Sequence, residues 1–242
     1  MSNSANHCNY DVEAAVRSRY AAAANTVQNV LCCAPSGANA PYLKALPQEI
    51  VDKDYGCGDL TPYVREGEAV VDLGCGAGKA CYILAQVVGA DGSVTGVDFN
   101  QPMLALARKY QKHVAERLGY ANTRFVKGRI QDLALDYRKV EAYLDKQPNR
   151  TAADLDAFES WKENERRSNP MISTASIDVV VSNCVLNLVR PEDKRALFAE
   201  MFRVLKKGGR IVVSDIVSDE DVPGHLQNDP ELWSGCISGS FR

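Results

Sequence analysis

The stretch VVDLGCGAGK, Val70–Lys79, decides the fold. An apolar run typical of a buried strand leads into three glycines at alternate positions, Gly74, Gly76 and Gly78, and a helical pattern follows. Strand, glycine turn and helix in this order form the ligand-binding turn of many nucleotide-binding α/β proteins, because glycines let the backbone approach a ligand without Cβ clashes. The stretch therefore predicts a strand that ends beside a nucleotide-type ligand.

Short apolar runs alternate with helical patterns outward from this stretch. The predicted strands are Ala69–Leu73, Ser93–Asp98, Thr123–Val126, Ile177–Ser182 and Arg210–Ile216. The predicted helices between them are Lys79–Val88, Pro102–Leu118 and Pro191–Leu205, and Gly208 and Gly209 are predicted to end the last of these. Such alternation indicates parallel strands joined by crossover helices, so we expect an α/β fold whose mostly parallel sheet carries helices on both faces.

Two regions stand outside this alternation. Residues 1–60 are expected to form a helical leader with cysteine-bearing loops, in which Tyr10–Asn29 and Tyr42–Val51 have helical patterns. The remaining domain, residues 61–242, is interrupted over residues 134–176 by polar sequence with helical periodicity. We expect a helical insertion there, with a solvated surface of mixed charge.

The composition excludes several classes of protein. No apolar run approaches the roughly 20 residues that a membrane helix needs, so no membrane association is expected. A net charge of -3 argues against nucleic acid as a partner. The start of the chain, Met1–Tyr10, is polar and lacks the apolar centre of a secretory signal, which predicts a cytoplasmic protein. In that compartment thiols stay reduced, so the 8 cysteines are interpreted as ligands, nucleophiles or small core residues and not as a disulfide scaffold.

A carboxylate at the glycine turn favours one kind of nucleotide ligand. Asp72 would repel a pyrophosphate, yet it suits the ammonium and sulfonium groups of S-adenosylmethionine. At the end of the next strand, Asp98 is expected to accept hydrogen bonds from both ribose hydroxyls, with Phe99 flanking the adenine and Ile130 covering its face. The other predicted cofactor contacts are Gly74, Cys75, Gly76, Gly78, Asn100, Met103, Asn183 and Val185, and Asn187 is expected to support the methionine end with Asn183. The alternative is a generic α/β turn with Asp98 as a solvated loop acid.

The ordered set of these features resembles class I S-adenosylmethionine methyltransferases over roughly Ala69–Ile216. The resemblance implies a Rossmann-like fold. In that family the strand that follows the adenine contacts ends beside the transferred methyl group. Here that strand ends in SNCVLNL, Ser182–Leu188, so the resemblance places Cys184 where the chemistry occurs.

The expected active-site segments lack an obvious base. Methyl transfer to oxygen or nitrogen needs a group that removes a proton from the acceptor. The histidines all lie outside those segments: His7, His113 and His225. Trivalent arsenic bound by thiolates carries a lone pair and no proton, and soft thiolates favour soft centres. Cys57, Cys184 and Cys236 each lie in a short, turn-capable loop and are therefore candidate arsenic ligands.

At these cysteines the resemblance becomes more specific, because DYGCGDL, SNCVLNL and LWSGCISG are similar to segments of arsenite methyltransferases. The resemblance implies that Cys57, Cys184 and Cys236 bind arsenic(III), supplied as arsenite or a thiol-bound form, and that Cys33 or its neighbour Cys32 completes the catalytic set in a disulfide relay. It also implies a thiol reductant such as thioredoxin or glutathione, and no metal ion as cofactor.

The resemblance extends over nearly the whole chain. The stretch LCCAP, the insertion and HLQNDPELWSGCISG are similar to a microbial branch associated with arsenosugar formation. That family usually continues into a further C-terminal region, so the chain, which stops at Arg242, is expected to lack it.

Several alternatives remain open for the cysteines. A zinc site is disfavoured because the paired C-x2-C spacing is absent. The chain could instead methylate a small organic acceptor while the cysteines only pack, or it could be a non-catalytic thiol protein that binds metalloids. Outside the candidate set, Cys81 is expected to be a small buried residue, Cys75 to pack within the glycine turn, and Cys8 to be a surface thiol.

Overall fold

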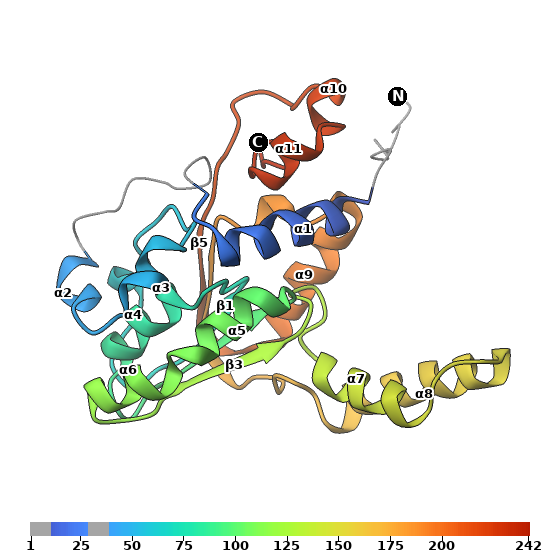
Figure 1. Ribbon diagram of the computed structural model, residues 1–242, viewed down its shortest axis with the longest axis horizontal. Helices are drawn as coiled ribbons and strands as arrows, with labels where there is room; N and C mark the ends of the chain where they lie inside the picture. Colours follow the sequence, from blue (N-terminus) through green and yellow to red (C-terminus); the bar gives the residue numbers. More distant parts are fainter. Residues whose placement is uncertain (1–10, 29–38) are drawn as a thin grey trace.

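The fold is a parallel sheet with helices on both faces (Figure 1). The computed structural model describes residues 11–28 and 39–242. The strands of the described residues are β1 (Ala69–Leu73), β2 (Ser93–Asp98), β3 (Thr123–Lys127), β4 (Ile177–Asn183) and β5 (Leu205–Ser214). They lie in the order β3-β2-β1-β4-β5, and every neighbouring pair is parallel. The predicted α/β class, with a parallel sheet and helices on both faces, is therefore confirmed.

Side chains of alternate strand residues fill two hydrophobic cores, one on each face of the sheet. On β1, Val70 belongs to one core, whereas Val71 and Leu73 belong to the other, as the two-residue period of a strand requires. The first core is covered by α4 (Lys79–Val88), α5 (Gln101–Lys109) and α6 (Gln111–Leu118). The second is covered by α9 (Pro191–Val204).

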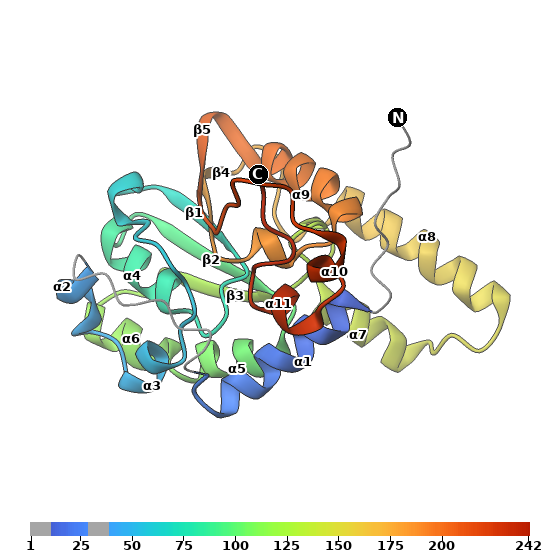
Figure 2. The ribbon, with the colours of Figure 1, turned by 90° about the horizontal axis from the view of Figure 1, so that it is seen from above.

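The leader packs onto this domain. Its first helix, α1 (Val12–Asn25), lies against α5 and against α11 (Pro230–Ser234), so residues near both ends of the sequence meet there (Figures 1 and 2). The predicted helix Tyr42–Val51 is instead two short ones, α2 (Ala40–Leu43) and α3 (Gln48–Asp52), because Pro47 precedes α3 and cannot continue a helix from α2.

Two predicted element boundaries are wrong. The single helix Pro102–Leu118 is divided between α5 and α6 at Tyr110, where the backbone N–H bonds to Ala107 O in a tighter turn. The glycines expected to end α9 lie instead inside β5. There the pairing with β4 jumps from Leu205 to Arg210, and Gly208, with φ +83°, lies in the resulting bulge.

The predicted insertion is an arm that projects from the domain (Figures 1 and 2). It consists of α7 (Tyr137–Lys146) and α8 (Ala152–Ser168), and α8 has no buried residue. Stacked rings hold the two helices together, with Tyr143 and Trp161 at a centroid distance of 4.5 Å. An ion pair of 2.9 Å between Arg166 and Asp132 joins the arm to the domain.

The remaining helices are short and lie in loops around the sheet. They are η2 (Thr61–Tyr63), η3 (Leu186–Leu188) and α10 (Gly224–Gln227). Across residues 11–28 and 39–242, none of the helices combines the length and apolar character needed to cross a membrane.

We expect Leu104→Ala in α5 to lower the free energy of unfolding by about 2 to 5 kcal/mol, because it leaves a cavity at a fully buried site. The matched control is Leu155→Ala on the arm, where the side chain is 49% exposed and the change should stay within about 0.5 kcal/mol. Urea unfolding followed by circular dichroism measures both. Equal losses in the two variants would contradict the proposed division between core and arm.

Candidate functional site

A cleft opens at the carboxyl ends of β1, β2 and β4, where a ligand is expected in an open parallel sheet. Most of the predicted cofactor residues line it, namely Asp72, Gly74, Cys75, Gly76, Asp98, Phe99, Asn100, Met103, Ile130, Asn183 and Val185. Cys184 lines it as well. Gly78, Asn187, Cys57 and Cys236 lie outside its lining, and Cys57 lines a neighbouring pocket. The strand-end pattern in the sequence therefore located one site, whereas the ligand role of each residue stays a prediction.

The glycine turn leaves the floor of the cleft open. All three glycines have positive φ, and Gly76, at +51°, has no atom within 4 Å of the position that a Cβ would take. Gly74 differs, because a Cβ there would lie 2.5 Å from Val185 Cγ1. One glycine thus exposes the backbone to a ligand, and the other allows the turn to pack against the segment that follows β4.

Buried carboxylates give the cleft a negative potential. Burial, and next the charges of Asp54 and Asp98, raise the pKa of Asp72 to about 7. Burial also raises the pKa of Asp98, whose oxygens accept hydrogen bonds from Gly76 N at 2.8 Å and Asn100 N at 2.7 Å. Asp54 forms an ion pair of 2.8 Å with Lys79. Among the described side chains, neither Asp72 nor Asp98 forms an ion pair, so the cleft favours a cationic ligand.

Helix α1 forms one wall of the cleft, a contribution that the sequence analysis did not predict. Glu13, Arg17 and Tyr20 line the cleft from successive turns of this helix, and Asn100 donates a hydrogen bond of 2.9 Å to Arg17 O. Burial, and next the neighbouring Cys236, raise the pKa of Tyr20. The spacing of these residues, three to four apart, indicates a shared helix face, but nothing local in the sequence specified what that face covers.

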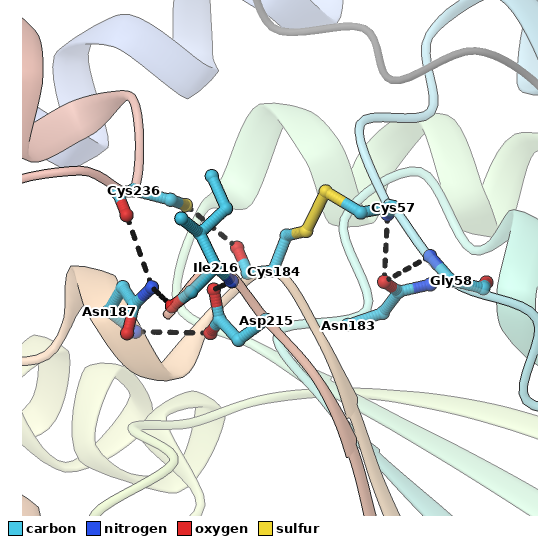
Figure 3. The surroundings of a disulfide bond; sticks show 8 residues. All are labelled: Cys57, Gly58, Asn183, Cys184, Asn187, Asp215, Ile216 and Cys236. Atoms are coloured by element: carbon cyan, nitrogen blue, oxygen red, sulfur yellow. Dashed lines mark hydrogen bonds between the residues drawn. A yellow bond between two sulfur atoms is a disulfide. The ribbon is translucent and has the colours of Figure 1, made fainter. Parts of the chain in front are cut away.

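Cysteines from three distant segments meet at the end of β4 (Figure 3). Cys57 and Cys184 form a disulfide across 127 residues of sequence. The Cys236 thiol donates a hydrogen bond of 3.1 Å to the carbonyl oxygen of Cys184. The expectation that cytoplasmic thiols exclude disulfides is thus not met at Cys57 and Cys184, because the fold brings their Cα atoms to 6.1 Å, within the usual bridging range.

Two asparagines hold the cysteine segments in place (Figure 3). Asn183 Oδ1 accepts hydrogen bonds from Cys57 N at 2.8 Å and Gly58 N at 3.0 Å. Asn187 Nδ2 donates to Ile216 O at 2.7 Å and Cys236 O at 3.1 Å. The predicted support of the methionine end by Asn187 stays a prediction, and in the structure the buried amide of Asn187 holds the Cys236 segment.

The structure describes two of the remaining five cysteines, Cys75 and Cys81. Cys81 is fully buried on α4, and Cys75 packs in the glycine turn with 7% of its surface exposed, as expected. Cys8, Cys32 and Cys33 lie outside the described residues, so the predicted disulfide relay stays a prediction. Within residues 11–28 and 39–242, no group of three or more His, Cys, Asp or Glu side chains could hold a metal ion.

Comparisons with known proteins agree with this geometry. The family model described as a methyltransferase domain matches residues 65–241. An arsenite methyltransferase of Aquipseudomonas alcaligenes is 35% identical over 87% of this chain and 51% of its own length, and that of Mus musculus is 32% identical over 82% and 44%. The crystal structure of an arsenic(III) S-adenosylmethionine methyltransferase from Chlamydomonas reinhardtii superposes with a TM-score of 0.63 at 32% identity, covering 86% of this chain and 58% of that one. The chain spans about half the length of the curated relatives it matches.

The raised pKa of Asp72 predicts a pH-dependent gain in stability for Asp72→Asn. Folding raises the pKa from an ordinary 3.8 to about 7, so the folded state binds this proton more tightly than the unfolded chain. The associated stabilisation is fully present below about pH 4 and is lost as the pH rises through about 7. The free energy of unfolding of the variant, relative to the natural protein, should therefore rise across that window and level off above it.

Urea titrations at about pH 5, 6, 7 and 8 would measure this difference. The variant keeps a carbonyl oxygen that can accept the hydrogen bond of Cys81, so packing is largely preserved. A difference that is independent of pH would show that Asp72 titrates in its ordinary range.

Proposed function

Because the chain belongs to the methyltransferase domain family, we propose that it transfers a methyl group from S-adenosylmethionine to trivalent arsenic held by Cys57, Cys184 and Cys236. The observation that carries the proposal is the meeting of these three cysteines at the end of β4, beside the cleft. Cys184 lines the cleft, Cys57 is bonded to it, and the Cys236 sulfur lies 3.1 Å from its carbonyl oxygen.

The cleft residues fit S-adenosylmethionine in charge and shape. The buried carboxylate of Asp72 would face the ammonium and sulfonium groups, and Asp98 would accept bonds from the ribose. The open backbone at Gly76 leaves room for close approach, while Phe99 and Ile130 offer apolar surfaces for the adenine. When bound, this cofactor supplies an electrophilic methyl group.

The three cysteines would make a base unnecessary. Arsenite exchanges its three hydroxyl groups for three thiols: three As–O bonds break, three As–S bonds form, and the thiol protons leave in three molecules of water. The bound arsenic keeps its lone pair and has no proton to lose. Catalysis would then come mainly from alignment, which is worth roughly 7 to 11 kcal/mol in the best intramolecular cases. The hydrogen bonds of Asn183 and Asn187 would fix that alignment.

A reducing step would precede arsenic binding. In the structure Cys57 and Cys184 are joined, so two electrons and two protons must restore both thiols before arsenic can bind them. Glutathione or thioredoxin would supply these in a cytoplasmic setting, and Cys33 or Cys32 would relay them if the predicted role is correct. Omitting the thiol should therefore stop methylation without stopping cofactor binding.

We expect Cys184→Ser to abolish arsenite methylation, with a loss of at least about a hundredfold, because the site loses the sulfur nearest the cleft. Cofactor binding should change by less than about threefold. The assay combines arsenite, excess thiol and labelled cofactor, and separates the arsenicals formed. Cys8→Ser, a sequence-predicted surface thiol, is the matched control.

Three outcomes distinguish the proposal from its rivals. Full methylation by Cys184→Ser would refute the assigned role of this cysteine. Arsenite binding without any methylated product in the natural protein would favour a non-catalytic metalloid protein. Cofactor binding without arsenite binding would favour a methyltransferase of a small organic acceptor.

Asn187→Ala should raise the KM for arsenite and leave cofactor binding unchanged. The substitution removes the hydrogen bonds from Asn187 Nδ2 to Cys236 O and Ile216 O, each of which contributes roughly 0.5 to 1.5 kcal/mol. Asn164→Ala, at an exposed position on α8, is the matched control. A loss of cofactor affinity equal to the change in KM would show a general structural defect instead.

A further inference from the structure

Two buried thiols lie beside the cleft and are not used by the proposed reaction. Cys75 follows β1 in the glycine turn, and Cys81 lies in the first turns of α4. The Cys81 thiol donates a hydrogen bond of 3.2 Å to Asp72 Oδ2. The two thiols lie close enough that each shifts the pKa of the other.

Gly96 on β2 creates the space that the two sulfur atoms share. A Cβ atom at this position would lie 2.7 Å from the Cys75 sulfur and 2.8 Å from the Cys81 sulfur. The sulfur atoms of Cys75 and Cys81 therefore both lie close to Gly96. Any larger residue at position 96 would push them apart.

The thiol pair is reached through the cleft. Cys75 and Asp72 line the cleft, whereas Cys81 lies behind them with no exposed surface. A small molecule that enters the cleft reaches Cys75 before Cys81, and a cofactor in the cleft would cover the pair. Binding of a small molecule at the thiol pair and binding of the cofactor in the cleft should therefore exclude each other.

We propose that Cys75 and Cys81 form a second, inhibitory site for small trivalent arsenicals, separate from the three cysteines at the end of β4. Two thiols suffice to chelate an arsenical that has two exchangeable groups. With methylarsonous acid, two As–O bonds break, two As–S bonds form, and the two thiol protons leave with the hydroxyl groups as two molecules of water. Arsenic stays trivalent, and no oxidant or base is required.

The pair is poorly suited to oxidation. Burial raises the pKa of Cys75 to about 11 and raises that of Cys81 well above its ordinary value, so both stay protonated. Thiolate is the form that oxidants attack, so protonation protects both thiols from oxidation. Thiolate is also the nucleophile that binds arsenic, so chelation at this pair should be slow, with the thiol protons leaving in water. In the structure Cys57 and Cys184 are oxidised while Cys75 and Cys81 remain thiols.

The site would make excess arsenical compete with the cofactor. Chelation at Cys75 places a bulky group in the glycine turn, where the cleft backbone must stay open. Methylation should then fall at high arsenical concentration and recover with more cofactor. This inference does not require arsenic to be the substrate, because the pair is independent of Cys57, Cys184 and Cys236.

A variant in which the other candidate thiols are removed leaves Cys8 as the only cysteine besides the pair. It carries serine at five positions: Cys32, Cys33, Cys57, Cys184 and Cys236. Incubation with methylarsonous acid, followed by intact-mass spectrometry, should show one added methylarsenic group with the loss of two hydrogens. Adding Cys81→Ser, whose hydroxyl can still donate to Asp72, should abolish the adduct. An adduct that survives Cys81→Ser, or none in the five-serine variant, would overturn the proposal.

A second measurement uses the otherwise natural chain and so does not depend on the folding of the five-serine variant. S-adenosylhomocysteine binding is titrated at increasing methylarsonous acid concentrations. The apparent Kd should rise in proportion to the arsenical in the natural protein and stay constant in Cys81→Ser. If the apparent Kd rose equally with methylarsonous acid in both proteins, the proposed inhibitory site would be refuted. The arsenite methylation assay tests the proposed function, and its result does not depend on this titration.

Discussion

The parallel pairing of β1 with β4 is the constraint on which the site depends. Leu73 lies beside Ser182 in this register, so the glycine turn after β1 and the cysteine after β4 emerge at the same edge of the sheet. Gly74 and Val185 then pack so closely that a side chain at position 74 would collide. A shift of one residue in this register would send alternate side chains to the opposite face and separate the two halves of the site.

At that edge of the sheet, hydrogen bonds between residues far apart in the sequence hold the loops in place. Asn183 and Asn187 are only four residues apart, yet one binds the segment at Cys57 and the other binds the segment at Cys236. The end of β4 thus organises loops from both halves of the chain. Electrostatics adds a second layer, since buried carboxylates whose pKa values are raised favour a cation in the cleft.

Local sequence patterns predicted the elements that local physics determines. The ranges of β1, β2 and α4 match the predicted ones, because apolar period and glycine position define them. The bulge at Gly208 depends on pairing with β4, and the disulfide depends on a contact across 127 residues, so neither has a local signal. For the site, strand-end residues such as Asp72 and Asp98 were located correctly. The wall formed by α1 and the hydrogen bond from Asn187 to the Cys236 segment depend on tertiary contacts and were missed.

The position of the arm has a consequence for the integrity of the molecule. Helices α7 and α8 lie in the sequence between Cys57 and Cys184, and they project from the domain where a protease could reach them (Figure 2). Cutting the chain in this arm would leave two fragments that remain covalently linked while the disulfide persists. Only reduction of the disulfide would remove the covalent link between the fragments. In the oxidised protein a cut in the arm therefore leaves one covalent molecule, whereas in the reduced protein only noncovalent packing holds the fragments together.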